Sequence, residues 1–214
     1  MFKSRRSKKK MIQKLHLDEQ MISTEQIRII RTNIDQEDNI KGTCLMVTSP
    51  GNVKQKSLIT SKLALSFAEQ GKRTLLIDAN VREPGIHEWF QLDNEHGWTN
   101  ALLKDESPGQ YIKETFQSDL YVLPTGSRVH HPGKLWVSEK IGNLMLIVKE
   151  EFDVVIFEAP ELLSVADPLV LMNHCDGVII VARNRHSRRE SAIQTKDMIE
   201  RARKPLVGVI FQTG

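Results

Sequence analysis

Short apolar runs recur along this 214-residue chain and alternate with segments that have helical spacing. This alternation constrains the fold more than any other feature. The runs that predict strands cover residues 43–48, 73–78, 119–123, 153–158, 177–182 and 206–211. Helices are predicted between them over residues 57–70, 84–90, 97–103, 135–150, 167–173 and 187–201. Strands that are apolar throughout suit a parallel sheet buried on both faces. The pattern therefore predicts an α/β domain, a mostly parallel sheet with helices on both faces.

Residues 49–58, Ser-Pro-Gly-Asn-Val-Lys-Gln-Lys-Ser-Leu, join the first predicted strand to a helix. A strand, a loop ending in Lys-Ser and a helix is the layout that cradles phosphates with backbone N–H groups and a helix N-terminus. The full pattern G-x-x-x-x-G-K-[ST] requires glycine at two positions where this chain has Pro50 and Gln55. The candidate nucleotide-binding residues that remain are Gly51, Lys56 and Ser57.

Two other strands end in an acid. Asp78 ends one apolar run and is followed by Asn80, and Glu158 ends another. The active site of a parallel α/β sheet lies at the C-terminal ends of its strands. Phosphoryl transfer requires a phosphate cradle, a carboxylate that holds Mg²⁺ and a base for the attacking hydroxyl. The candidate catalytic residues are therefore Asp78, Asn80 and Glu158, and the candidate Mg²⁺ ligands are Ser57, Asp78 and Glu158.

The order and spacing of these motifs resemble a known family over about residues 20–212. It is the family of bacterial tyrosine kinases that control capsule and exopolysaccharide synthesis, P-loop proteins related to the partitioning and cell-division ATPases. Leu75–Arg82 resembles the family's second Walker motif, and residues 25–31 fit its E-x-x-R-x-x-R oligomerisation motif. Leu123–Gly126, followed by a proline-containing loop, also lies in the expected place.

The resemblance implies a P-loop NTPase-like fold, with ATP and Mg²⁺ as cofactors. It implies self-association through Glu25, Arg28 and Arg31, although the same residues fit a local ion-pair ladder on one helix. It also implies a partner, a transmembrane polysaccharide chain-length-type adaptor whose cytoplasmic tail reaches the nucleotide site. Asp167 and Arg183 match acidic and basic positions common in the family, and either residue could be structural.

The chain departs from the family pattern in each nucleotide motif. Val53 and Gln55 place Cβ atoms where family glycines let the backbone approach phosphate and adopt positive φ. Asn80 cannot act as a base or bring negative charge to Mg²⁺. Glu158 stands where the family has aspartate, and its extra methylene moves the carboxylate by about a bond length. The tyrosine cluster that family members phosphorylate at the C-terminus is also expected to be missing.

These departures favour a tyrosine-kinase-like regulator that is catalytically weak or inactive. It would act by binding to itself or to an active kinase paralogue, and to the adaptor. The alternative is an active ATP-dependent protein tyrosine kinase with an unusual nucleotide site. A partitioning-type ATPase is disfavoured, because Pro50 and Gly51 stand where that class has an additional signature lysine.

The charge of +3 is modest but gathers in the first residues, from Lys3 to Lys10. A basic arm over residues 1–20 and a single kinase-like domain over 21–214 are therefore expected. The arm is either a solvated tail or a contact with an anionic membrane surface. Nucleic acid is not expected, because Phe2 is the sole aromatic residue among the charges. The sequence has neither a secretion signal nor a membrane-spanning stretch, which predicts a cytoplasmic protein, peripheral at the inner face of the membrane.

Cysteine and histidine side chains bind metals or react in many proteins, but in this chain they are expected to be structural or solvated. Cys44 and Cys175 lie in or beside apolar runs and are expected to be buried free thiols. His130 and His131 are adjacent in a loop and cannot easily aim at one ion, so a solvated loop is expected there.

Overall fold

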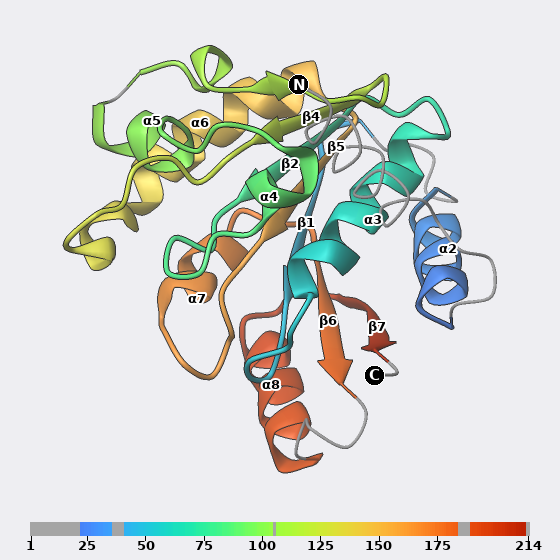
Figure 1. Ribbon diagram of the computed structural model, residues 1–214. Helices are drawn as coiled ribbons and strands as arrows, with labels where there is room; N and C mark the ends of the chain where they lie inside the picture. The colour runs from blue at the N-terminus through green and yellow to red at the C-terminus, as the bar shows by residue number, and fades with distance from the viewer. Residues whose placement is uncertain (1–21, 36–40, 105, 184–188, 213–214) are drawn as a thin grey trace.

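The computed structural model describes residues 22–35, 41–104, 106–183 and 189–212. These residues form an α/β domain around a sheet of seven strands in the order β3-β4-β2-β5-β1-β6-β7 (Figure 1). The basic arm predicted over residues 1–20 lies outside the described residues. Within the described ranges, no helix is long and apolar enough to cross a bilayer.

The predicted strands and helices all have counterparts. The strands are β1 (Thr43–Thr48), β2 (Thr74–Asp78), β3 (Lys113–Glu114), β4 (Leu120–Leu123), β5 (Val154–Glu158), β6 (Gly177–Arg183) and β7 (Leu206–Gln212). The helices are α2 (Ile22–Asp35), α3 (Lys56–Ala68), α4 (Ile86–Phe90), α5 (Trp98–Lys104), α6 (Ser138–Glu151), α7 (Asp167–Met172) and α8 (Arg189–Arg201). Neighbouring strands pair in parallel, except that β3 pairs with β4 antiparallel. This edge strand was not predicted, because a strand of two residues has no apolar run to mark it.

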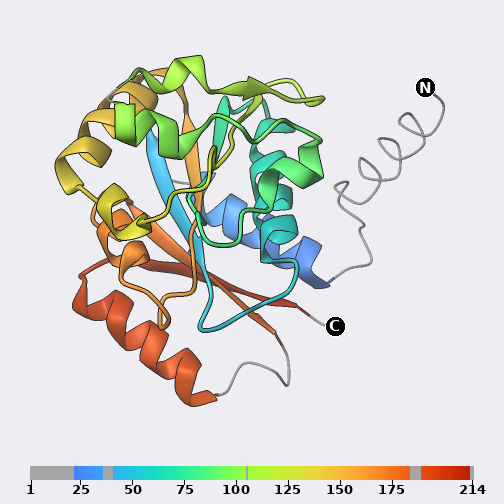
Figure 2. The same ribbon diagram turned by 60° about the vertical axis from the view of Figure 1, so that its left-hand side comes forward.

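Side chains of each buried strand alternate between two apolar layers, as the period of a strand requires. On β1, Cys44 and Met46 face the layer that contains residues of α5, α6, α7 and α8. Leu45 and Val47 face the opposite layer, which contains residues of α2, α3 and α4. Figure 2 shows α6, α7 and α8 on one side of the sheet and α2 and α3 on the other. The predicted parallel sheet with helices on both faces is confirmed.

The register of the central strands brings the sequence motifs together. β5 lies between β1 and β2, and its last residue, Glu158, is level with Val47 on one side and Asp78 on the other. The loop after β1 leads into α3 at the same edge of the sheet. The three strand ends that carry the candidate chemistry therefore meet, as the sequence predicts.

Candidate nucleotide site

The loop between β1 and α3 keeps a left-handed residue just before the helix. Gln55 has φ 66° and ψ 17°, in the region that glycine adopts without penalty. Its backbone oxygen accepts the N–H of Ile59 at 3.1 Å, and its side-chain oxygen accepts the Gln212 amide N–H at 3.0 Å. The chain therefore reaches a glycine-like conformation at residue 55 despite its Cβ atom, at a cost of about 1 kcal/mol.

The rest of the loop forms one wall of a cavity of about 440 Å³. Val53 is buried in the apolar layer beneath α3, and its oxygen accepts the Lys56 N–H at 3.1 Å. Gly51 does not line the cavity, and a Cβ atom there would meet no atom within 4 Å. The lining residues are Asn52, Val53, Lys54, Gln55, Lys56, Ser57, Asn80, Arg82, Glu83, Glu158, Pro160, Glu161, Ser164 and Val165.

Lys56, the residue expected to contact phosphate, is already paired. Its Nζ atom lies 2.7 Å from Glu158 Oε1, and both side chains are buried, with 6% and 2% of their surface exposed. The same ammonium donates to the carbonyl of Ala159, and Glu158 Oε2 accepts the Thr60 hydroxyl. Both carboxylate oxygens of Glu158 are therefore engaged by side chains of α3.

Asp78 is completely buried and accepts hydrogen bonds from the backbone ahead of it. Oδ2 accepts the N–H groups of Gly85 and Ile86, each at 3.0 Å, and Oδ1 accepts the N–H of Asn80 at 3.2 Å. Burial raises the pKa of Asp78 to about 7, and the charge of Glu158 acts in the same direction, whereas the N–H groups of Ile86 and Gly85 lower it. In this structure the carboxyl stabilises the start of α4.

Ser57, the expected hydroxyl ligand for Mg²⁺, is also engaged by the α4 region. Its Oγ atom accepts the indole N–H of Trp89 at 3.1 Å. A Cβ atom on Gly85 would lie 2.9 Å from this oxygen, so the backbone of residue 85 packs directly against the hydroxyl.

The second motif forms a turn and an ion pair. The Asn80 side-chain oxygen accepts the Glu83 N–H at 3.3 Å, which closes the turn after β2. Arg82 Nε lies 3.3 Å from Oδ2 of Asp167, a buried residue that begins α7. The ion pair between Arg82 and Asp167 therefore connects the second motif to α7. Arg183, the basic residue expected to match the family, lies half-buried at the end of β6.

The residues present fit the two halves of MgATP differently. The left-handed residue before α3 and the cavity beside the loop fit a phosphate group. The metal half does not fit Mg²⁺, because Asp78 is buried outside the cavity lining and Ser57 accepts the Trp89 N–H. Mg²⁺ requires near-octahedral oxygen ligands and usually retains several waters.

Several partners in the site were not found from the sequence. Thr60 lies four residues after Lys56, so helical spacing already places both side chains on one face of α3. Trp89 and Gln212 reach the loop from distant parts of the chain, and no local pattern marks them. Trp89 is 32 residues from Ser57 along the sequence, and Gln212 is 157 residues from Gln55.

The candidate oligomerisation residues lie on α2, away from this cavity's lining. Glu25 Oε2 and Arg28 Nη1 are 3.9 Å apart, one step of the expected ion-pair ladder. Arg31 donates to the carbonyl of Ser66 at 3.2 Å, and so it anchors α2 to α3. The helix buries Ile27, Ile30 and Ile34 beneath it.

The remaining expectations concern thiols and histidines. Cys44 and Cys175 are buried free thiols, as predicted. Their Sγ atoms lie 3.5 Å apart. His130 and His131 are exposed in a loop, also as predicted.

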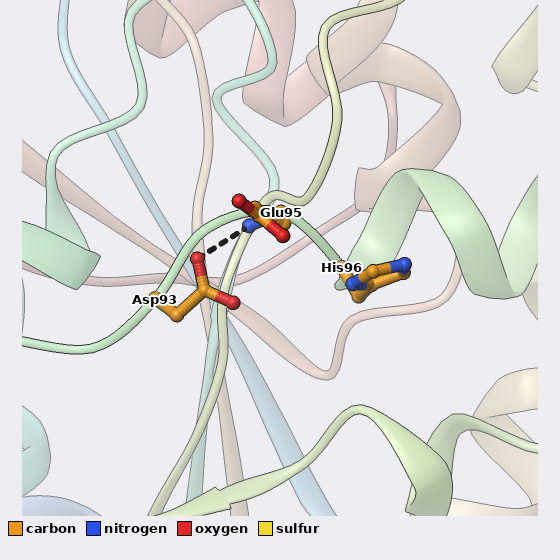
Figure 3. Close-up of side chains that lie close together, drawn as sticks. All are labelled: Asp93, Glu95 and His96. Carbon is orange, nitrogen blue, oxygen red and sulfur yellow. Dashed lines mark hydrogen bonds between the residues drawn. The ribbon is translucent and has the colours of Figure 1, made fainter.

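Asp93, Glu95 and His96 gather in a different loop (Figure 3). All three side chains are exposed. Asp93 Oδ1 accepts the N–H of Glu95 at 3.1 Å, the dashed line in Figure 3. The ring of His96 stacks on Tyr111 with 6.2 Å between centroids. These contacts describe a solvated turn packed on an aromatic side chain.

Comparisons with known proteins agree with this fold. No protein-family model matches the chain. The chain is 34% identical to tyrosine-protein kinase YwqD of Bacillus subtilis over 193 residues, which cover 89% of this chain and 81% of that protein. The crystal structure of the chimerical protein CapA2B2 superposes with a TM-score of 0.80 at 27% identity, covering 88% of this chain and 83% of the other.

A more distant likeness concerns the fold alone. The cell-division ATPase MinD of Pyrococcus furiosus has a TM-score of 0.67 at 17% identity, covering 78% of this chain and 70% of MinD. The chain therefore has a MinD-like P-loop fold and belongs to the family of bacterial tyrosine-protein kinases.

Proposed function

We propose that this protein is a tyrosine-kinase-like regulator of capsule or exopolysaccharide synthesis whose own catalysis is weak or absent. It acts by binding other proteins. The buried ion pair between Lys56 and Glu158 is the observation that carries this proposal. In a P-loop enzyme the loop lysine stabilises the β- and γ-phosphates, and here a carboxylate of the same chain occupies that ammonium.

A nucleotide phosphate would have to compete with Glu158 for the ammonium group of Lys56. A nucleotide phosphate that recruits Lys56 must break or share a contact of 2.7 Å and leave Glu158 buried without its main counter-charge. Leaving such a charge uncompensated costs about 3–5 kcal/mol, or two to four powers of ten in affinity. Asn80 adds a second defect, because an amide cannot accept the proton of the attacking hydroxyl.

The proposed partners are a second copy or an active kinase paralogue, and a transmembrane adaptor at the cytoplasmic face. The outward surface of α2 supports the first of these, since Glu25 lies beside Arg28 with 66% of its side chain exposed. Ile29 on the same helix is 52% exposed, an apolar side chain available to a partner. The basic Lys3–Lys10 arm would add affinity for anionic lipid.

Catalytic weakness is tested by titrating MgATP and MgADP calorimetrically, beside a phosphotyrosine assay with YwqD as the active reference. Lys56→Met removes the loop lysine. Lys54→Met is its matched control, because Lys54 is exposed and lines the same cavity. We expect no phosphotyrosine and no nucleotide affinity that depends on Lys56. Tyrosine phosphorylation that Lys56→Met abolishes and Lys54→Met preserves would overturn the proposal.

Binding to proteins is tested separately. Arg28→Glu reverses a charge of the α2 surface, and Thr32→Glu places the same new residue on an exposed position one turn away. We expect Arg28→Glu to weaken association with a second copy or the paralogue about tenfold, with Thr32→Glu near wild type. A peptide with the adaptor's cytoplasmic tail should bind both variants alike. A tail that binds YwqD but not this protein would remove the adaptor from the proposed partners.

An active kinase is the second candidate, and one observation favours it. Gln55 adopts the left-handed conformation that a glycine in the loop would adopt, and the cavity beside it is open to Lys54 and Lys56. In that case MgATP would bind at micromolar concentration, the substrate would be supplied in trans, and Lys56, Ser57, Asp78 and Glu158 would hold the nucleotide.

A further inference from the structure

Helix α4 and the residue before it contact two of the three candidate Mg²⁺ ligands, Asp78 at the end of β2 and Ser57 on α3. The N–H groups at its start, from Gly85 and Ile86, donate to the carboxylate of Asp78. Trp89, about one turn later, donates its indole N–H to the hydroxyl of Ser57 at 3.1 Å. Three N–H groups, two from the backbone and one from an indole, therefore donate to the oxygen atoms that a divalent cation would otherwise contact.

The close approach of this segment depends on a glycine. A Cβ atom at Gly85 would lie 2.9 Å from Ser57 Oγ and 3.2 Å from Ser57 Cβ. A side chain at this position would require either Ser57 or the start of α4 to shift. Glycine therefore lets the start of α4 approach Ser57 closely, and this approach accompanies the contact of Trp89 with the hydroxyl.

The burial of Asp78 also separates this carboxyl group from the cavity. Asp78 is 0% exposed and is not among the residues that line the cavity, whereas Ser57 and Glu158 are. Glu158 is itself committed to Lys56 at 2.7 Å. An Mg²⁺ ion requires oxygen ligands at about 2.0–2.1 Å and usually keeps several of its waters. Asp78, fully buried outside the cavity lining, leaves no room for those waters around it.

We propose that α4 closes the metal half of the site, so that this protein does not recruit a divalent cation and the loop binds nucleotide phosphates metal-free. This inference rests on the proposed function, in that it describes the same altered nucleotide site. It adds a ligand class, a nucleoside diphosphate or triphosphate without its metal, bound in the cavity beside the loop. The groups that occupy the candidate metal ligands are the backbone N–H groups of Gly85 and Ile86 and the indole of Trp89.

The test compares ADP binding to the full chain in excess Mg²⁺ and in excess chelator. We expect the two dissociation constants to agree within about twofold, because the metal contributes no contact to the protein. A gain of about tenfold or more in Mg²⁺ would overturn the proposal. If ADP binds in neither buffer, metal-free nucleotide binding is overturned, and water-proton relaxation with Mn²⁺ then tests the closure by α4 alone. A protein-bound Mn²⁺ signal would overturn the closure, and its absence supports the closure.

Two matched variants test the role of α4. Trp89→Phe keeps an aromatic side chain but removes the indole N–H that contacts Ser57. Trp136→Phe is the control, because the Trp136 indole N–H is buried without a hydrogen-bond partner. We expect Trp89→Phe to introduce an Mg²⁺ or Mn²⁺ response that the control lacks. An identical metal response in both variants would remove Trp89 from the closure.

The failure of this inference and that of the proposed function are distinguishable. A tenfold effect of Mg²⁺ without any phosphotyrosine would overturn the closure by α4 and leave a kinase-like regulator that binds MgADP. Phosphotyrosine formation would overturn the proposed function, whatever the metal dependence of ADP binding.

Discussion

At the scale of single residues, Lys56 and Glu158 have become a structural pair. Removing one partner leaves a buried charge, whereas removing both leaves none. We expect Lys56→Met to lower the free energy of unfolding by about 3–5 kcal/mol. The double variant Lys56→Met/Glu158→Gln should recover most of that loss. Urea denaturation of the single and double variants measures both values, and a loss below about 1 kcal/mol for Lys56→Met would show that the pair is not formed in solution.

Asp78 gives the fold a pH dependence with a definite sign. Its pKa is raised by burial from 3.8 to about 7, so between these values the folded protein holds a proton that the unfolded chain has lost. The free energy of unfolding should therefore fall as pH rises through this window, by at most about 1.4 kcal/mol per pH unit for this one group. Asp78→Asn lacks the titration, so the stability of wild type relative to this variant should fall between pH 3.8 and about 7 and be flat above that window. A relative stability of wild type that rises with pH within the window would contradict the raised pKa.

Gln55 tests how much strain the loop stores. Gln55→Ala and Gln55→Gly both remove the contact with Gln212, but only glycine also removes the Cβ atom from the left-handed conformation. We expect the glycine variant to be more stable than the alanine variant by about 1 kcal/mol. Equal thermal midpoints would mean that residue 55 leaves the left-handed region in solution.

At the scale of elements, the start of α5 packs tightly against the loop after β4. A Cβ atom at Gly97 would meet the carbonyl of Pro124 and lie 2.8 Å from the backbone nitrogen of Gly126. Between them, Thr125 donates its hydroxyl to the backbone oxygen of Asp78 at 2.9 Å. The loop with the sequence Leu-Pro-Thr-Gly thus connects α5 to the end of β2.

This packing predicts a large cost for a small side chain. We expect Gly97→Ala to destabilise the fold by about 3 kcal/mol, because only backbone atoms could move to make room. Gly109→Ala is the control, since its Cβ atom would meet nothing closer than Ser107 Oγ at 3.7 Å. That variant should stay within about 0.5 kcal/mol of wild type. Urea denaturation compares the two, and similar midpoints would contradict the contact.

Elements that bury both faces could be predicted from the sequence, because their apolar runs are long enough to stand out. β3 could not, since two partly exposed residues pair with β4 through backbone atoms. In the site, the loop and the acids Asp78 and Glu158 were predicted to meet because each ends a strand. Their actual partners depend on how α4 docks, and Trp89 gives no local signal of its contact with Ser57.

At the scale of the whole molecule, β1 lies in the interior of the sheet, with β5 on one side and β6 on the other. Cys44 lies on β1, and Cys175 lies just before β6 with its Sγ atom 3.5 Å away. The two thiols are 0% and 1% exposed. Burial raises the pKa of Cys44 well above its ordinary value, so the reactive thiolate is disfavoured as well as inaccessible.

A thiol reagent should therefore reach these cysteines only when the sheet itself opens. We expect Cys44 and Cys175 to be labelled at the same slow rate, with a urea dependence equal to that of global unfolding. Cys44→Ser and Cys175→Ser assign the two rates. If Cys175 were labelled faster and without urea dependence, the segment between α7 and β6 would open independently of the sheet. Equal rates would instead make the P-loop scaffold one cooperative unit, because separating these thiols requires β1 to leave its place between β5 and β6.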